Sequence, residues 1–246
     1  MAARVDILMY HAIDKAKAPT SISPATFAAQ MRALAESRVP VIAMDAVADH
    51  LARGNGPAVA ITFDDGFQDF ADTAWPVLRR HGFPAMVYVP TEHIGGGEHW
   101  AGGHDPARRL MNWDTVRGLA SEGVDFGNHS ASHADLAALD RARVEAELDE
   151  ATARIAEELG TPPRHAAPPY GRSTRQVRAL LASRFATSVG TALGSAKRGD
   201  NLHDLPRLEM FYFTSQARWH DQLAGRGGVY LVLRRAARTL RQRFAA

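Results

Sequence analysis

Residues 58–66 read Ala58-Val59-Ala60-Ile61-Thr62-Phe63-Asp64-Asp65-Gly66, an apolar run that ends in two carboxylates and a glycine. The run is typical of a buried strand, and a helical pattern begins near Phe67. Because successive residues of an extended chain point to opposite sides, Asp64 and Asp65 can take different roles. One can bind a cation while the other moves a proton. An N-cap followed by a turn glycine is a simpler interpretation of the same residues.

Strand and helix patterns alternate along nearly the whole chain, which indicates an α/β fold with parallel strands. A (β/α) barrel is favoured by the number of these units, and an open doubly wound sheet stays as the alternative. Strands are predicted at residues 5–10, 39–43, 58–63, 83–89, 123–127, 185–189 and 208–213. Helices are predicted within residues 21–39 and at 45–53, 67–81, 112–121, 140–159 and 174–182, and a long loop at 91–108.

The composition excludes several classes of function. The 246 residues are 46% hydrophobic and 23% charged, as in a globular protein with a substantial core. No cysteine is present, so a metal site must use histidine and carboxylate ligands. A net charge of +2 is too small to indicate nucleic-acid binding. Because no signal peptide and no apolar stretch of about 20 residues is found, we expect a cytoplasmic protein.

A second group of polar residues, His129-Ser130-Ala131-Ser132-His133, follows the strand predicted at residues 123–127. Two histidines four residues apart on a helical turn lie on one face and can share an ion. Standing alone, the pair is equally well explained as surface histidines. Together with an aspartate from another strand end, the pair forms a His, His, carboxylate set, which is a common arrangement for a catalytic divalent metal.

This set of residues indicates metal-assisted hydrolysis of an amide or ester. The cation polarises a carbonyl and acidifies water, while the aspartate that does not bind the metal takes a proton. In barrels such groups gather where the strands end. Zn²⁺ is the expected ion, although Co²⁺, Ni²⁺ or Fe²⁺ would suit the same ligands.

The two motifs resemble those of the polysaccharide deacetylase family, also called the NodB homology group or carbohydrate esterase family four. Residues 62–66 match its first motif and residues 129–133 its second. The resemblance covers roughly residues 5–213 and extends to Pro168-Pro169-Tyr170-Gly171, which is similar to the third motif. It implies a distorted (β/α) barrel with about seven parallel strands, in residues 1–225, followed by a basic helical tail in residues 226–246.

The resemblance also implies roles for individual residues. Asp64 would be the catalytic base, and Asp65, His129 and His133 would bind the metal. Pro168, Pro169 and Tyr170 would line the substrate groove, with the Tyr170 N–H as an oxyanion donor.

The chain departs from the family pattern at two places. Position 167 is alanine where the third motif has an arginine that orients the base, and we hypothesise that Arg207 restores that charge. The family's general acid is a late histidine, for which His203 is the nearest candidate. An ordinary loop position for His203 is an equally good interpretation. We expect His11 and the loop residues His93, His99 and His104 to be ordinary histidines.

Residues 229–244 have the pattern of a basic amphipathic helix. One face holds Val229, Leu233, Ala236, Ala237, Leu240 and Phe244, and the other holds Arg234, Arg235, Arg238 and Arg241. The favoured interpretation is a terminal helix that packs its apolar face on the barrel. The alternative is peripheral contact with an anionic membrane at its inner face.

The sequence therefore predicts a metal-dependent hydrolase. Its substrate would be an N-acetylated amino sugar in a polysaccharide, an oligosaccharide or a lipid-linked glycan. An O-acetyl carbohydrate esterase and a catalytically impaired carbohydrate-binding protein on the same scaffold are the alternatives.

Overall fold

The structure is a computed structural model that describes residues 2–15, 20–54, 56–100, 102–103 and 106–244, with side chains of the last helix as far as Ala237. His104 lies outside the described residues.

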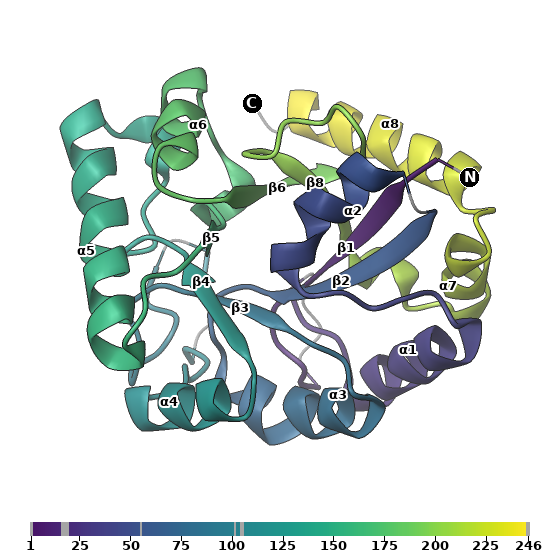
Figure 1. The fold of residues 1–246 in the computed structure, drawn as a ribbon, viewed down its shortest axis with the longest axis horizontal. Helices are drawn as coiled ribbons and strands as arrows, with labels where there is room; N and C mark the ends of the chain where they lie inside the picture. The colour runs from purple at the N-terminus through teal and green to yellow at the C-terminus, as the bar shows by residue number, and fades with distance from the viewer. Residues whose placement is uncertain (1, 16–19, 55, 101, 104–105, 245–246) are drawn as a thin grey trace.

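Seven parallel strands close into a barrel with helices around it (Figure 1). The order β2-β3-β4-β5-β6-β8-β1 returns to β2 through a parallel β1–β2 pairing, so the predicted barrel is confirmed over the open sheet. The strands are β1 (Arg4–Tyr10), β2 (Pro57–Phe63), β3 (Met86–Val89), β4 (Asp125–Asn128), β5 (His165–Ala166), β6 (Thr187–Leu193) and β8 (Leu205–Glu209).

The barrel is regular on one side and distorted on the other. β1 and β2 pair in register from Arg4 opposite Pro57 to Tyr10 opposite Phe63. β4 and β5 share a single pair, Asn128 with Ala166, and the register shifts between β6 and β8. β7 (Ala196–Lys197) adds a short antiparallel pairing to the start of β1. The distortion lies among the strands that flank the site described below.

The helices cover the outside of the barrel, and local capping explains where several begin. Ser23, Asn112, Asp140 and Thr174 each accept a hydrogen bond from a backbone N–H of the first helical turn, which satisfies a donor that the helix leaves free. The helices are α1 (Pro24–Ser37), α2 (Val47–Arg53), α3 (Trp75–His81), α4 (Trp113–Ser121), α5 (Arg141–Leu159), α6 (Arg175–Ala182), α7 (Gln216–Leu223) and α8 (Gly228–Phe244).

Alternate residues of each strand face two different cores. Val5 and Ile7 of β1 and Ala58 and Ala60 of β2 belong to an inner cluster, which Val47 and other residues near α2 close at one end of the barrel. The residues between them pack outward against the helices. Continued along β2, this alternation turns Thr62 and Asp64 inward.

Two predicted strands differ from the structure, and three observed elements were not predicted. Residues 39–43 form no strand and contribute only a bridge between Val41 and Val59. The last strand ends at Glu209, because residues 210–213 turn into a 3₁₀ helix. Helix α7 was not predicted, and neither were the two-residue strands β5 and β7, which are too short to show a period.

Helix α8 packs with the face opposite to the one favoured from the sequence. Leu231 is 7% exposed, whereas Val229 and Leu233 are 74% and 64% exposed. The favoured interpretation, in which the Val229–Leu233 face packs on the barrel, is therefore wrong. Among the described residues, no helix is long and apolar enough to cross a bilayer. The division of the chain at residue 225 stays a prediction.

Gly127 of β4 provides a test of packing inside the barrel. A Cβ at this position would lie 2.5 Å from Tyr88 Cδ1 and 2.9 Å from the His165 carbonyl oxygen. We therefore expect Gly127→Ala to lower the free energy of unfolding by about 1–3 kcal/mol in urea denaturation. The control is Gly118→Ala in α4, where no atom lies within 4 Å of the new Cβ. It should be neutral or stabilising by up to about 1 kcal/mol, and equal effects of the two substitutions would contradict this packing.

Candidate active site

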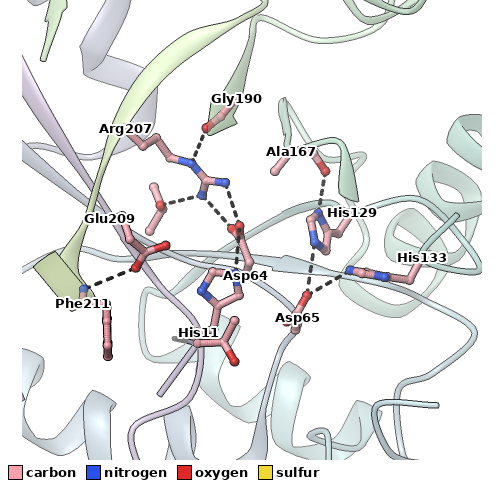
Figure 2. Close-up of polar contacts among 12 residues, drawn as sticks. His11, Asp64, Asp65, His129, His133, Ala167, Gly190, Arg207, Glu209 and Phe211 are labelled. Carbon is pink, nitrogen blue, oxygen red and sulfur yellow. Dashed lines mark hydrogen bonds and ion pairs between the residues drawn. The ribbon is translucent and has the colours of Figure 1, made fainter. Parts of the chain in front are cut away.

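The polar residues from the two motifs meet at the carboxyl ends of the barrel strands (Figure 2). β2 leads into Asp64 and Asp65, and β4 leads into His129. Asp65, His129 and His133 are all buried, and one ligand atom from each lies within 4.8 Å of the others. Nε2 of His129 and Nε2 of His133 lie 3.3 Å and 3.2 Å from Asp65 Oδ1.

This donor set fits a divalent cation. Two imidazole nitrogens and one carboxylate oxygen converge on one point, and three protein ligands leave further positions open. Burial disfavours the charged form of Asp65, but hydrogen bonds to His129 and His133 outweigh it and lower the pKa of this carboxyl. The three residues predicted to bind a metal are therefore brought together in a form suited to one.

A left-handed backbone, and not the helical turn considered from the sequence, brings the two histidines together. Asp65, Ser130 and His133 have φ values of 72°, 63° and 58°. Such conformations are costly for residues with a side chain and persist where the surroundings hold them. Here Glu147 of α5 holds the loop, since its carboxylate accepts hydrogen bonds from the backbone N–H groups of Ala131 and Ser132 at 3.0 Å and 2.9 Å. The sequence analysis did not single out Glu147.

The two histidines are oriented by different means. Nδ1 of His129 donates to the carbonyl oxygen of Ala167 at 2.5 Å, so Nε2 faces Asp65. Nδ1 of His133 is buried without a hydrogen-bond partner. Its ring instead stacks on Trp100, with centroids 4.2 Å apart, and meets the edge of Tyr170 at 4.9 Å. Aromatic packing therefore orients the second histidine.

Asp64 is held by Arg207, which extends from β8 into the barrel. Both nitrogens of the guanidinium fork donate to Asp64, Nη1 to Oδ1 and Nη2 to Oδ2, each at 2.7 Å. Nε of Arg207 donates to the Gly190 carbonyl at 2.9 Å, and Nη1 also donates to Thr62. The structure thus brings Arg207 to Asp64, as hypothesised for a chain with alanine at position 167.

Burial alone would raise the pKa of Asp64. The charge and hydrogen bonds of Arg207 outweigh the burial, with smaller contributions from His129 and His11, and hold the pKa of this carboxyl below its ordinary value. Asp64 is therefore an ionised carboxylate at neutral pH, in a nearly dry setting.

His11 approaches Asp64 from the end of β1. Its Nε2 lies 3.9 Å from Asp64 Oδ2, and its Nδ1 is buried without a hydrogen-bond partner. Glu209, at the end of β8, lines the same cavity. Burial raises the pKa of Glu209, and the neighbouring His11 opposes the rise. His11, expected to be an ordinary histidine, thus lies inside the site.

His203 lies at the opposite end of the barrel. It lies just before the start of β8. Its Nε2 is 3.0 Å from the carbonyl oxygen of Phe185, which lies just before the start of β6. The site is at the carboxyl ends of these strands. The structure therefore does not bring the predicted general acid to the metal ligands.

Two adjoining cavities meet at His133, one of the three candidate metal ligands. The inner one, of about 380 Å³, contains Asp64, Asp65 and both histidines. The outer one, of about 830 Å³, shares His133 and Tyr170 with it and extends to His93 and His99. The residues common to both cavities are Trp100, Gly102, His133 and Tyr170.

The third-motif residues line this groove only in part. Tyr170 is 39% exposed in it and takes a left-handed backbone conformation with φ 59°. Pro168 and Pro169 are buried and line neither cavity. Their predicted place on the groove surface is corrected accordingly.

The loop over the site contains an ion pair that was not predicted from the sequence. Arg108 donates to Glu98 from Nε at 2.7 Å and from Nη2 at 2.9 Å, and its guanidinium lies 4.2 Å from the centre of the Phe67 ring. Glu98 is 3% exposed. Glu98, Arg108 and Trp100 all fall in a stretch without periodicity, so only its unusual length pointed to a function.

Comparison with known proteins identifies the family of this chain. The family model for polysaccharide deacetylase matches residues 52–186, more than half of the chain. YxkH of Bacillus subtilis (strain 168) is 23% identical over 212 residues, which cover 85% of this chain and 72% of YxkH. A chitin deacetylase of Pestalotiopsis sp. is 29% identical over 111 residues, 45% of this chain and 33% of that protein.

Solved structures share the fold. The Streptococcus pyogenes deacetylase PplD, in complex with acetate, matches with a TM-score of 0.72 and 22% identity over 85% of this chain and 92% of its own. IcaB from Ammonifex degensii matches with a TM-score of 0.74 and 23% identity over 92% of this chain and 98% of its own. At these identities the likeness supports the barrel architecture.

The Arg207–Asp64 pair yields a prediction about stability. Without Arg207, Asp64 is a buried carboxylate without its cation, so Arg207→Ala should lower the free energy of unfolding by about 3–5 kcal/mol at pH 7. In the variant, burial raises the pKa of Asp64 above its unfolded value. The deficit relative to wild type should therefore shrink toward pH 4, where Asp64 takes up a proton. Urea denaturation of wild type and variant at pH 7 and at pH 4, in the presence of a chelator, measures this difference in the free energy of unfolding.

The matched control is Arg184→Ala, which removes a surface ion pair to Asp149. Exposed pairs contribute at most about 1 kcal/mol. A deficit for Arg207→Ala that is equally small, or that does not change with pH, would contradict the described electrostatics.

Proposed function

Since the chain belongs to the polysaccharide deacetylase family, we propose that it is a metal-dependent hydrolase which removes an N-acetyl group from an amino sugar. One observation carries the proposal. A converging Asp65, His129, His133 set lies directly beside a second carboxylate, Asp64, which an arginine keeps ionised. A protein that only binds carbohydrate through a metal would need the Asp65, His129, His133 set alone, whereas a hydrolase also needs a residue that moves a proton.

Asp64 is the proposed general base. Its lowered pKa keeps it ready to accept a proton, and two carboxylate oxygens offer lone pairs beyond those that Arg207 occupies. Such a weak base needs an acidic water, and a divalent cation on Asp65, His129 and His133 supplies that acidity when bound and polarises the substrate carbonyl. Zn²⁺ is the proposed ion, with Co²⁺, Ni²⁺ and Fe²⁺ as alternatives.

His11 is the proposed general acid in place of His203. Loss of an amine from the substrate requires a proton, which a histidine near neutral pH can deliver. Nε2 of His11 lies 3.9 Å from Asp64 Oδ2, and His11 lines the inner cavity together with Asp64 and Asp65. The backbone N–H of Tyr170 stays the proposed oxyanion donor.

The proposed substrate is an N-acetylated amino sugar within a longer glycan. The inner cavity has room for the acetamido group and its sugar, and the adjoining outer cavity continues past Tyr170 and Trp100. Aromatic rings at such a junction suit the apolar faces of sugar rings. A polysaccharide, an oligosaccharide and a lipid-linked glycan all present this chemistry. We favour the hydrolase over the impaired binding protein, because Arg207 supplies the charge that Ala167 lacks.

Metal binding and deacetylation can be tested together. We expect purified protein to bind close to one equivalent of Zn²⁺ or Co²⁺ and to release acetate from oligomers of N-acetylglucosamine. His133→Ala should lose both properties. Asp64→Asn should keep the metal, measured by elemental analysis, but lose activity about 10²–10⁴-fold. If wild type bound no metal after incubation with either ion, the hydrolase would be rejected.

The two candidate acids can be distinguished directly. His11→Gln should reduce kcat about 10²–10⁴-fold, with metal content unchanged. His203→Gln should leave kcat as in wild type. The opposite pattern would return the acid role to His203.

A further inference from the structure

Helix α8 exposes its aliphatic side chains to solvent. Val229, Val232 and Leu233 are 74%, 62% and 64% exposed, the largest exposures among the large hydrophobic side chains that are described. Ala236 and Ala237 are exposed as well. At 100° per residue these five side chains fall on one side of the helix, which we call the outer face of α8.

The opposite side of α8 is fixed to the barrel by polar and aromatic contacts. The Tyr230 hydroxyl donates to the Tyr212 carbonyl oxygen at 2.7 Å, and the Arg234 guanidinium lies 4.8 Å from the centre of the Tyr212 ring. Arg235 donates to the Leu193 carbonyl oxygen, and Leu231 is buried. Rotating the helix to bury the outer face would break all of these contacts.

The outer face is therefore an apolar surface without a covering element among the described residues. Scattered exposed aliphatic residues are ordinary, but a continuous stripe along a helix marks an interaction surface. In Figure 1, α8 runs along the outer edge of the molecule.

The size and composition of the outer face suit lipid better than protein. Five small aliphatic side chains on a single helix cover well under the roughly 800 Å² per partner of a stable protein interface. As far as Ala237, where the described side chains of α8 end, the outer face contains none of the aromatic or methionine residues that anchor protein interfaces. An aliphatic face of this kind is what an interfacial helix inserts among lipid acyl chains.

The charge of the same segment selects the lipid. After Asp221 the chain contains no acidic residue and six arginines: Arg226, Arg234, Arg235, Arg238, Arg241 and Arg243. Arg226 pairs with Asp221, and Arg234 and Arg235 contact the barrel, so the segment keeps a net positive charge beside the outer face. A cationic segment beside an aliphatic stripe is attracted to an anionic bilayer surface. We propose that the outer face of α8 docks the protein on the surface of an anionic lipid bilayer.

Vesicle flotation tests the docking. Full-length wild type should float with vesicles of phosphatidylcholine and phosphatidylglycerol and bind at least tenfold more weakly to phosphatidylcholine alone. Val232→Gln combined with Leu233→Gln keeps the net charge and should weaken binding to anionic vesicles at least tenfold. The matched control, Ala142→Gln with Ala153→Gln, changes two exposed positions of α5 and should bind like wild type.

Three results would overturn the proposal. The first is that wild type does not float with anionic vesicles. The second is that the Val232→Gln, Leu233→Gln double substitution leaves flotation unchanged, which would assign binding to charge alone. The third is that wild type binds no vesicles but forms a stable dimer in light scattering, which the double substitution dissociates; this result would assign the outer face to a second copy of the chain. Acetate release from a soluble oligosaccharide should be the same for all variants. A failure of the proposed deacetylase function can therefore be distinguished from a failure of the proposed docking.

Discussion

The buried ion pair between Arg207 and Asp64 is the contact on which the barrel and the site both depend. It joins β8 to the end of β2 across the strand that lies between them, and the same guanidinium binds Thr62 and Gly190. Removing two charges from water is expensive, and only bidentate geometry with every donor satisfied offsets that cost. The pair therefore constrains where β8 can lie relative to β2, and through that the width of the barrel beneath the cavity.

The same pair explains how alanine is accommodated at position 167. A small residue there leaves space in the inner cluster, and its carbonyl still accepts the hydrogen bond that orients His129. The cation that holds Asp64 comes instead from a neighbouring strand. What Asp64, the proposed base, requires is a positive charge in bidentate reach, and the position in the chain that provides it is free to differ.

Much of this arrangement could be predicted from the sequence because it follows from strand alternation. The period of two along β2 turns Asp64 inward, and the same period along β8 turns Arg207 inward, so their meeting needed only a closed barrel. The convergence of Asp65, His129 and His133 was predictable for a related reason, since parallel strands end at one face. Glu147 was not predictable, because it belongs to a charged helix whose loop partners are set by tertiary packing.

Two of the differences between prediction and structure, the position of His203 and the face of α8, share a physical cause. A local pattern says which residues lie together on an element, but it does not say toward what that element turns. His203 follows a leucine in a plausible setting, yet it precedes its strand and so lies at the wrong end of the barrel. The periodicity of α8 was correct, yet Tyr230 and Arg234 make the specific contacts that choose its inward side. Hydrophobic burial is non-directional, whereas hydrogen bonds and cation–π contacts are directional, so a few polar side chains decided an orientation that the apolar pattern alone favoured wrongly.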